Sequence, residues 1–418
     1  WERCRDTIAG SDAIKRKGTE YLPKLDGQDS NEYEAYKKRA NFYGATRRTI
    51  GGLLGSVMRR RPEVAFPDEG YLESVTIDGD SFDVLAQFTI REMLSVGRLG
   101  LLIDAPSDGT GEQMPYIAPY LAENVTNWRT AVVNGRRQTI QVVLREKHET
   151  QGTDEFETKE EVQYRVLELT VPPGSTTPIY QQRLFREVKG ENKPDEWVEV
   201  YAEWHADGTY TQYPFVPSKR GAAFDYIPFV FCNTTDLSSD VKEPPLLDMI
   251  DVNLSHYRTS ADLEHGAHYT ALPTAWVAGF EPNTKLRIGA STAWISDKTD
   301  AKAGFLEFKG QGLNSLRDLM DDKERMMAVL GSRMLEDQKK AAEAEGTMKL
   351  RTAYESGSLV SIANMAGQAL TRALEIVAEW AGATVDNIMV KFNTDFVAAR
   401  LQPNEFVALT QALQAGAI

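Results

Sequence analysis

Side chains that could hold a metal ion gather in the segment LLDMIDVNLSHYRTSADLEHGAHY, residues 246–269. His265 and His268 are three residues apart, so on a helix they would share one face and could chelate an ion together. Glu264 would point about 100° away from His265, and His256 would lie on the opposite side of the helix. The segment has neither an HExxH motif nor a clear third ligand. We therefore predict no metal site and interpret the histidines as polar, partly exposed helix positions; a hydrolase site at His265 and His268 is the alternative.

Motifs of other catalytic chemistries are absent from the sequence. It contains no GxxxxGK[ST] phosphate loop, no GxGxxG after a strand and no GxSxG nucleophile elbow. The adjacent Asp321 and Asp322 could form a catalytic dyad, but Lys323 and Arg325 beside them favour a solvated, salt-bridged helix face. We predict that the chain is not an enzyme and has no catalytic residue and no cofactor.

Composition and charge exclude some partners. The 418 residues carry a formal net charge of −14 and are 42% hydrophobic, which is typical of a folded protein of two or three domains. A compact nucleic-acid reader needs a basic face, so we do not expect this chain to grip DNA, although it could surround it. Cys4 and Cys232 lack zinc or CxxC spacing and are expected to be free thiols in a reducing compartment. The longest run without a charged residue or histidine, Ser356 to Thr371, is shorter than the about 18 residues that span a bilayer, so we expect no membrane partner.

Helices are predicted for the N-terminal part of the chain. Helical spacing of apolar residues predicts one helix over 31–61 that ends before Pro62. Its last part, RRTIGGLLGSVMRRRP, could lie on a membrane surface, but its short apolar run favours a buried segment with close packing at Gly51 and Gly55. A second helix is predicted over 82–96, closed by a glycine.

Strands are predicted from there to about residue 232. The continuous apolar run LGLLID, residues 99–104, indicates a buried strand. Asn134-Gly135 between two β-rich runs predicts a hairpin, and the polar segment over 148–161 predicts a surface loop. Further strands are predicted over 164–171, 181–188, 197–204 and 226–232.

Helices return after Pro244-Pro245. An apolar stripe with helical spacing runs from Leu247 to Ala261 in a helix that ends by Pro273. The remaining predictions are a mixed, β-prone segment over 274–312, a helix over 313–335, a polar stretch over 336–347, a long helix to Gly382, a strand over 388–396 and a helix from Pro403. This order of elements predicts an α+β fold.

The order of elements and the local sequence resemble the portal (head-to-tail connector) protein family of tailed double-stranded DNA bacteriophages. The similar stretches are WERCRDTIAG, EYEAYKKRANFYGATRRTIGGLLGSVMRRRP, DYIPFVF, PPLLDMIDVNLSHYRTSADLEHG, IMVKFNTDF and PNEFVALTQALQAG. The resemblance covers almost the whole chain. It implies a portal fold and a ring of subunits, expected to be a dodecamer, around a channel through which DNA is packaged and ejected.

The resemblance assigns a part to each segment. Residues 1–243 would form a wing, with a helical part over 1–97 and a β-rich part over 98–243. The other parts would be a first stem helix over 244–272, a clip over 273–312, a second stem helix over 313–335, a tunnel loop over 336–347, a long wing helix and returning strand over 348–400, and the start of the crown-side helices over 401–418. Because the crown would follow Ile418 and the chain begins without Met, we expect both ends to be trimmed.

The resemblance also implies which side chains meet the partners. In the tunnel loop these are Gln338, Lys339, Lys340, Glu343 and Glu345. The two lysines are expected to approach the DNA phosphates, and a solvated connector is the alternative. On the first stem helix they are Asp262, Glu264, His265 and His268, whose acids would repel the duplex and keep it centred. In the clip they are Lys285, Arg287, Asp297 and Lys298, which would face the packaging motor and later the tail adaptor.

The implied partners are further copies of the chain, double-stranded DNA in transit, a terminase motor that supplies ATP hydrolysis, the major capsid protein and scaffold, and a head-tail adaptor. The implied location is the portal vertex of the virion, with assembly in the host cytoplasm. Two alternatives remain open: another phage head-tail adaptor or structural protein, and a metal-dependent hydrolase that uses His265 and His268.

Overall fold

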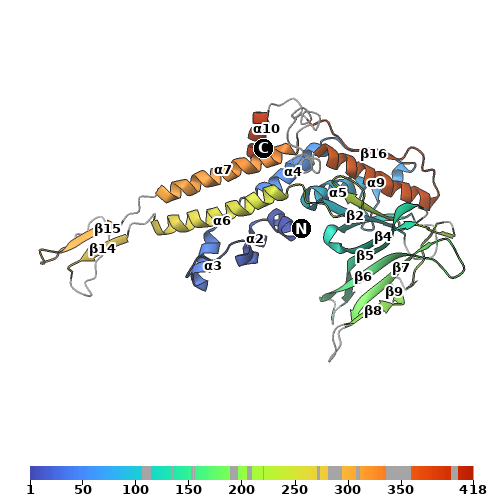
Figure 1. Ribbon diagram of the computed structural model, residues 1–418, viewed down its shortest axis with the longest axis horizontal. Helices are drawn as coiled ribbons and strands as arrows, with labels where there is room; N and C mark the ends of the chain where they lie inside the picture. Colours follow the sequence, from blue (N-terminus) through green and yellow to red (C-terminus); the bar gives the residue numbers. More distant parts are fainter. Residues whose placement is uncertain are drawn as a thin grey trace.

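The computed structural model describes residues 1–105, 114–133, 135–151, 154, 156–188, 196–204, 210–219, 221–270, 274–280, 294–306, 311–335, 359–396 and 403–417. The molecule is elongated (Figure 1): a pair of long helices with a small β hairpin at its far end projects from a body that contains the β-sheets. Helices and strands both make up large parts of the chain, so the prediction of an α+β protein is confirmed.

Five α-helices lie in the first 97 residues: α1 (Glu2–Ala9), α2 (Ser11–Lys17), α3 (Ser30–Arg39), α4 (Ala45–Val57) and α5 (Phe82–Val96). Short 3₁₀ turns are η1 (Gly18–Glu20), η2 (Glu69–Glu73) and η3 (Ala122–Asn124). A capping box begins α3, in which Asp29 and Glu32 accept hydrogen bonds from each other's backbone N–H. The helix α5 has the predicted bounds and ends at Gly97, whose φ of 78° suits glycine.

The prediction of one helix over 31–61 is wrong, because the chain leaves the helical conformation between α3 and α4. Ala40 has a φ of −56° and a ψ of 134°. The next residue, Asn41, exchanges two hydrogen bonds of 2.8 Å with the Ser260 hydroxyl, one through its N–H and one through its carbonyl. Ser260 belongs to α6 (Leu247–Thr270), so contacts with a distant helix outweigh the local helical pattern.

The glycine packing predicted for the arginine-flanked segment lies at a different residue. Gly51 and Gly55 are exposed, and no atom lies within 4 Å of a Cβ built on either. At Gly52 a Cβ would lie 2.5 Å from the side chain of Leu413 in α10 (Pro403–Gln414). The close helix contact therefore occurs at a neighbouring position, about a quarter turn around α4 from the face predicted.

The strands form two main antiparallel sheets. The fully buried strand β2 (Arg98–Asp104), which the apolar run predicted, is the centre of a sheet with β3 (Tyr116–Leu121) and β13 (Phe229–Asn233). The larger sheet has the order β4 (Val125–Val133), β5 (Arg136–Gln151), β6 (Thr158–Thr170), β7 (Ile179–Val188) and β8 (Glu196–Val200). The predicted hairpin between β4 and β5 is confirmed. The predicted loop over 148–161 is wrong in large part, because pairing of β5 with β6 continues to Gln151 opposite Thr158.

Shorter strand pairs complete the described sheets. They are β1 (Glu63–Ala65) with β16 (Met389–Lys391), β9 (Ala202–Trp204) with β10 (Tyr210–Gln212), β11 (Ser218–Lys219) with β12 (Ala222–Ala223), and β14 (Thr274–Ala278) with β15 (Lys302–Leu306).

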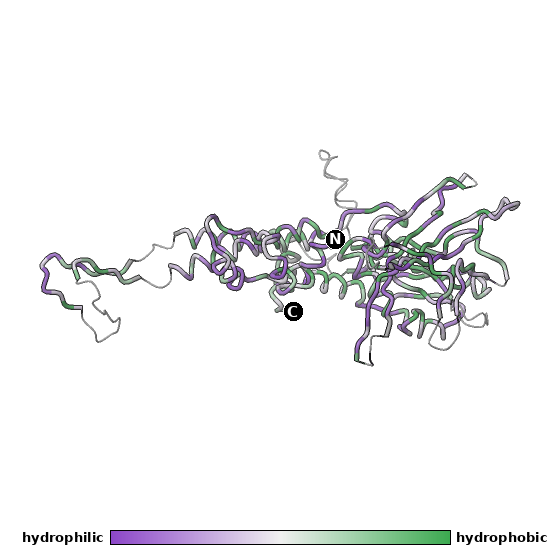
Figure 2. The backbone as a smooth tube through the Cα atoms, turned by 90° about the horizontal axis from the view of Figure 1, so that it is seen from below, coloured by the Kyte–Doolittle hydropathy of each residue, from purple (hydrophilic) through white to green (hydrophobic). Residues whose placement is uncertain are grey.

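The helix α9 (Leu359–Ala381) runs through the main core of the body. Its apolar stripe is buried from Leu359 to Ile376, and it packs with residues of α5 and β2. A Cβ at Gly367 would lie 2.7 Å from the carbonyl oxygen of Val390, so a glycine lets β16 lie close against this helix. In Figure 2 hydrophilic and hydrophobic colours alternate along the projecting helix pair, as expected for helices that are covered on one side. None of the helices within the described ranges combines the length and the apolarity that a membrane crossing requires.

Candidate functional site

The helix pair consists of α6 and α7 (Gln311–Arg333), which lie side by side and run antiparallel because the hairpin β14–β15 joins their far ends (Figure 1). The helices α1, α3 and α4 contact α6, while α4 and α10 contact α7. The predicted apolar stripe of α6 is confirmed: Ile250, Leu254, Tyr257 and Ala261 are buried in one cluster, and Leu247 packs against it.

His256 is buried between the two long helices. Only 2% of its surface is exposed, so the prediction of a partly exposed position is wrong for this histidine. Its Nε2 lies 3.3 Å from Oε1 of Glu324 on α7, and its ring lies 5.6 Å from that of Tyr43. Burial lowers the pKa of His256, an effect that the Glu324 carboxylate opposes only in part. His256 is therefore a structural link between α6 and α7.

The other predicted residues of α6 contact the N-terminal helices. Asp262 accepts a hydrogen bond of 2.6 Å from the Tyr36 hydroxyl, and Glu264 accepts one of 3.1 Å from the Asn41 amide. Asp251, further along the same helix, forms an ion pair with Arg3 at 2.9 Å. These three acids therefore have partners within the same chain, which leaves α6 with less unpaired negative charge than the sequence predicted.

His265 and His268 do not form a metal site in the described structure. The guanidinium of Arg39 lies 3.2 Å from Nδ1 of His265, where it would repel a cation. Burial, together with this guanidinium, lowers the pKa of His265. His268 is exposed beside the ring of Tyr269, at 5.2 Å between centroids. Within the residues that the structure describes, no group of three His, Cys, Asp or Glu side chains could hold a metal ion.

The charged segment of α7 has two different faces. Asp322 and Arg325 form an exposed ion pair at 3.1 Å, as predicted for a solvated helix face. Lys323 turns inward instead and donates hydrogen bonds to the Ser255 carbonyl at 3.1 Å and to the Thr259 hydroxyl. Burial lowers the pKa of Lys323, with a smaller contribution from a nearby arginine. This lysine joins the two long helices and does not belong to the solvated face.

The hairpin β14–β15 carries exposed aromatic side chains. Trp276 is 42% exposed and Phe305 is 53% exposed. The Trp276 indole lies across Gly304 of the opposite strand, where a Cβ would approach its Nε1 to 3.0 Å. Phe305 lies on the other face of the ladder and is 6.4 Å from the ring of Trp294. No residue over 275–280 or 294–305 is buried, so both faces of the hairpin are open in the single chain.

The predicted clip and tunnel-loop residues lie only in part within the described residues. Of the predicted clip residues, Asp297 and Lys298 are exposed, and Lys285 and Arg287 lie outside the described residues. The predicted tunnel-loop residues, Gln338, Lys339, Lys340, Glu343 and Glu345, also lie outside the described residues.

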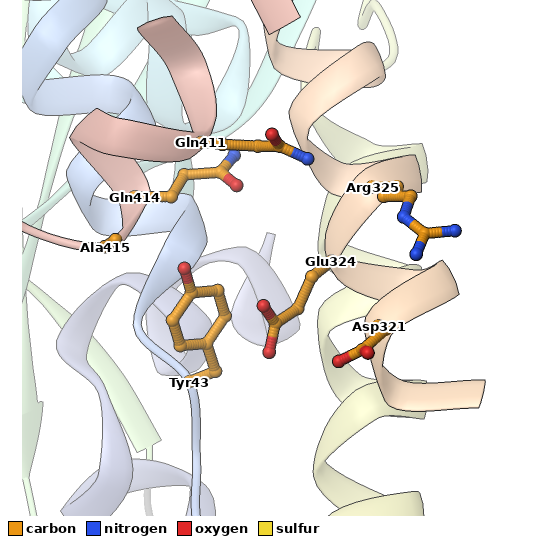
Figure 3. A pocket seen from close by; sticks show the side chains of 7 residues that line it. All are labelled: Tyr43, Asp321, Glu324, Arg325, Gln411, Gln414 and Ala415. Atoms are coloured by element: carbon orange, nitrogen blue, oxygen red, sulfur yellow. The ribbon is translucent and has the colours of Figure 1, made fainter. Parts of the chain in front are cut away.

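Sequence reasoning missed a polar cavity near the body end of the helix pair. It has a volume of about 240 Å³ and is lined by Tyr43, Asp321, Glu324, Arg325, Gln411, Gln414 and Ala415 (Figure 3). These residues come from the segment before α4, from α7 and from the C-terminal helix α10. Because the three segments are far apart in sequence, no local motif could have indicated that they meet.

Comparison with known proteins gives one match by sequence. Residues 245–381 match a family described as a domain of unknown function, DUF4055, and this range includes the helix pair, its hairpin and α9. No curated protein matches the sequence.

Two matching solved structures come from gene transfer agent (GTA) particles. One is described as the virion of a native GTA particle, and its chain is 10% identical, with a TM-score of 0.41 and coverage of 97% of this chain and 94% of that chain. The other is described as the neck of an empty GTA particle computed with C6 symmetry, with 10% identity, a TM-score of 0.40 and coverage of 98% and 95%. At these values a likeness does not identify a shared fold, so the function proposed below is based on the contacts of this chain and on the resemblance of its sequence.

Proposed function

We propose that this protein is the subunit of a phage portal, a ring-shaped channel at one vertex of the capsid. In this role the ring passes double-stranded DNA during packaging and ejection, binds the terminase motor first and the head-tail adaptor later, and contacts the major capsid protein and scaffold. The helix pair would be the stem, the hairpin region the clip and the strand-rich body the wing. The site of action would be the virion, after assembly in the host cytoplasm.

The observation that carries this proposal is the hairpin at the end of the helix pair. A two-stranded hairpin is marginally stable by itself in water, and this one has no buried residue over 275–280 and 294–305. Trp276 on one face and Phe305 on the other expose aromatic surface that a partner would cover. Two open faces favour a neighbour on each side, which is the arrangement of heterologous contacts that close a ring.

The charge of the chain fits a conduit better than a DNA-gripping protein. Each phosphate that a protein neutralises adds affinity, and tight binding would stop DNA from sliding. A net charge of −14 with scattered cations supplies little such binding. Under this proposal Lys339 and Lys340 meet the phosphates at the narrowest point of the channel. The exposed clip residues Asp297 and Lys298, with Lys285 and Arg287, meet the motor and the adaptor.

The first test is the mass and symmetry of the purified particle, by native mass spectrometry with class averages from electron microscopy. We expect a closed ring, a dodecamer, with an axial hole. A chain that remains monomeric or dimeric at every protein concentration would contradict the proposal of a self-assembling ring. A two-fold symmetric assembly without a hole would contradict it as well, since an isologous contact cannot form a channel of this kind.

A pair of variants tests whether ring formation requires the hairpin. The double substitution Trp276→Ser and Phe305→Ser should prevent ring formation while the chain stays folded, because neither residue contributes to a buried core. The matched control is Ile77→Ser, which removes a still more exposed apolar side chain from a body loop and should leave the ring intact. Rings formed equally well by both variants would remove the hairpin from the interface.

A further inference from the structure

Both outer strands of the five-stranded sheet have an open edge. In Figure 1 β4 lies on one side of this sheet and β8 on the other, and each is paired with only one strand, β5 or β7. Within the described part of the chain, no backbone group bonds to the outer edge of either strand. An open edge offers a row of backbone N–H and carbonyl groups to another strand.

The two edges lack most of the features that protect an edge strand from pairing. Proline and β-bulges are such features. The strand β8 contains no proline and pairs with β7 in an unbroken register. The strand β4 has register shifts near Asn127 and Thr130, but over 130–133 it pairs regularly with β5. Each edge therefore offers a regular stretch to a further strand.

Large apolar side chains are exposed along these stretches. On β8 Trp197 is 43% exposed and Val198 is 44% exposed. Successive residues of a strand point to opposite faces, so apolar surface is uncovered on both faces of β8. Tyr201, which follows β8, is 66% exposed, and Val132 on β4 is 72% exposed. A strand added at either edge would cover part of this surface.

The two edges carry opposite charge. The segment over 125–140, which includes β4 and its turn, has three arginines and no acid. The segment over 196–204, which includes β8, has three glutamates and neither lysine nor arginine. The three arginines are all exposed: Arg129, Arg136 and Arg137. One sheet therefore ends in a basic edge on one side and in an acidic edge on the other.

Two of the three glutamates remain available at the edge of β8. Glu203 is bound by Arg186 of the same chain. Glu196 is exposed, and Glu199 has the guanidinium of Arg183 at 3.8 Å, which is too long for a hydrogen bond. Opposite charges across a contact favour the correct partner, whereas like charges disfavour the wrong one. The edge of β8 is therefore complementary to the edge of β4 and not to itself.

We propose that the open edge of β8 binds the open edge of β4 of a second copy of this chain, so that the sheet continues from one subunit into the next. The contact joins two different surfaces of the same chain, so it is heterologous and can repeat around a closed ring. The inference rests on the proposed ring and adds to it a second contact, at the opposite end of the molecule from the hairpin β14–β15 (Figure 1).

The test is cross-linking of the assembled full chain with a short bismaleimide, which joins two thiols that lie close together. The native Cys4 and Cys232 are fully buried and do not react in the folded chain. The double variant Val132→Cys with Val198→Cys has one exposed thiol at each edge. We expect a ladder of covalent oligomers from this variant and no cross-link from either single variant, because the two thiols meet only between copies.

The matched control is Val132→Cys with Val171→Cys. Val171 is 59% exposed and follows β6, which is paired on both sides, so this variant should give no ladder. Intact rings of the edge variant without a ladder, or an equal ladder from the control, would overturn this inference and leave the portal proposal standing. Covalent dimers of Val198→Cys alone would overturn it as well, since they indicate contact between like edges. A wild type that forms no ring would contradict both proposals.

Charge reversal tests the chemistry of the contact. Glu196→Arg or Arg129→Glu, each added to the edge variant, should lower the yield of the ladder by about two- to fivefold, the range expected for an exposed ion pair. Both side chains are exposed, so these variants keep the fold. The two reversals together should restore the yield, because the charges of the two edges are then exchanged. A yield that neither reversal changes would overturn the pairing of an acidic edge with a basic one.

Discussion

The two ends of the helix pair differ in how their side chains are satisfied. Toward the body, α6 and α7 bury polar groups that bond to partners on another segment, as with His256 and Glu324 or Lys323 and the Ser255 carbonyl. At the far end the hairpin buries no described residue and exposes Trp276 and Phe305. The first end packs against other segments of the same chain, whereas the second leaves apolar surface uncovered in the single chain. This difference separates contacts that fold the subunit from contacts that we expect to assemble it.

The largest expected effect on stability comes from substituting a buried residue of the helix pair, and it is compared with the substitution of an exposed residue of the hairpin. Ile250 in α6 is fully buried, so Ile250→Ala should lower the free energy of unfolding by about 2–5 kcal/mol. Phe305→Ala in the hairpin should change it by less than about 0.5 kcal/mol, because that ring is half exposed in the single chain. Urea unfolding at a protein concentration too low for assembly measures both. A large loss for Phe305→Ala would mean that the hairpin folds against its own subunit.

A smaller effect is expected for the buried hydrogen bond between α6 and α4. The amide nitrogen of Asn253 donates to the Thr46 hydroxyl at 2.9 Å, and both residues are fully buried. Thr46→Val conserves the shape and leaves this donor unpaired, so the free energy of unfolding should fall by about 1–3 kcal/mol. Thr130→Val on the exposed strand β4 is the control and should cost nothing measurable. Equal effects at both positions would show that the loss of the buried bond is not the cause.

Sequence reasoning succeeded where one local pattern determined the structure. The spacing of apolar residues located α6, whose stripe is buried as predicted, and Asn134-Gly135 located the turn between β4 and β5. It failed where distant segments decided the outcome. The break at Ala40 follows from the bonds of Asn41 with Ser260, and the contact at Gly52 follows from Leu413.

The same limit of sequence-based reasoning applies to the candidate sites. The aromatic residues of the hairpin were visible as short β-prone runs, but nothing in their sequence distinguishes a buried strand from an exposed one. His256 lies in a pattern that also fits an exposed position, and its burial depends on α7 and Tyr43. The cavity beside Gln414 needs three segments in contact, which no window of the sequence contains.

The stability contributed by the buried part of the helix pair should also depend on pH. The pKa of His256 is lower in the folded chain than its ordinary value of about 6.5. The unfolded chain therefore binds the proton more readily than the folded chain. The contribution of His256 to the free energy of unfolding is fully present above about pH 6.5, and it is lost as the pH falls toward the pKa of the folded state. The slope from one such proton is at most about 1.4 kcal/mol per pH unit.

His256→Asn removes this group and should flatten the stability profile below about pH 6.5, as measured by urea unfolding at each pH. His268→Asn is the control, because that histidine is exposed and its substitution should leave the slope unchanged. The charged groups that face His256 are Glu324 and Lys323, both on α7, and the Tyr43 hydroxyl lies nearby. A slope that persists in His256→Asn would assign the acid sensitivity to another group, of which His265 is the nearest candidate on α6.

The smallest expected effect belongs to the ion pair between Asp322 and Arg325. Both side chains are 65% exposed and lie three residues apart on one helix. Asp322→Asn should therefore lower the free energy of unfolding of the isolated chain by less than about 0.5 kcal/mol, and added salt should abolish the difference. The same substitution can be measured in the assembled particle. If it weakens assembly there by more than it weakens folding, this face of α7 lies against a neighbouring subunit, and the boundary between folding contacts and assembly contacts extends from the hairpin up the helix pair.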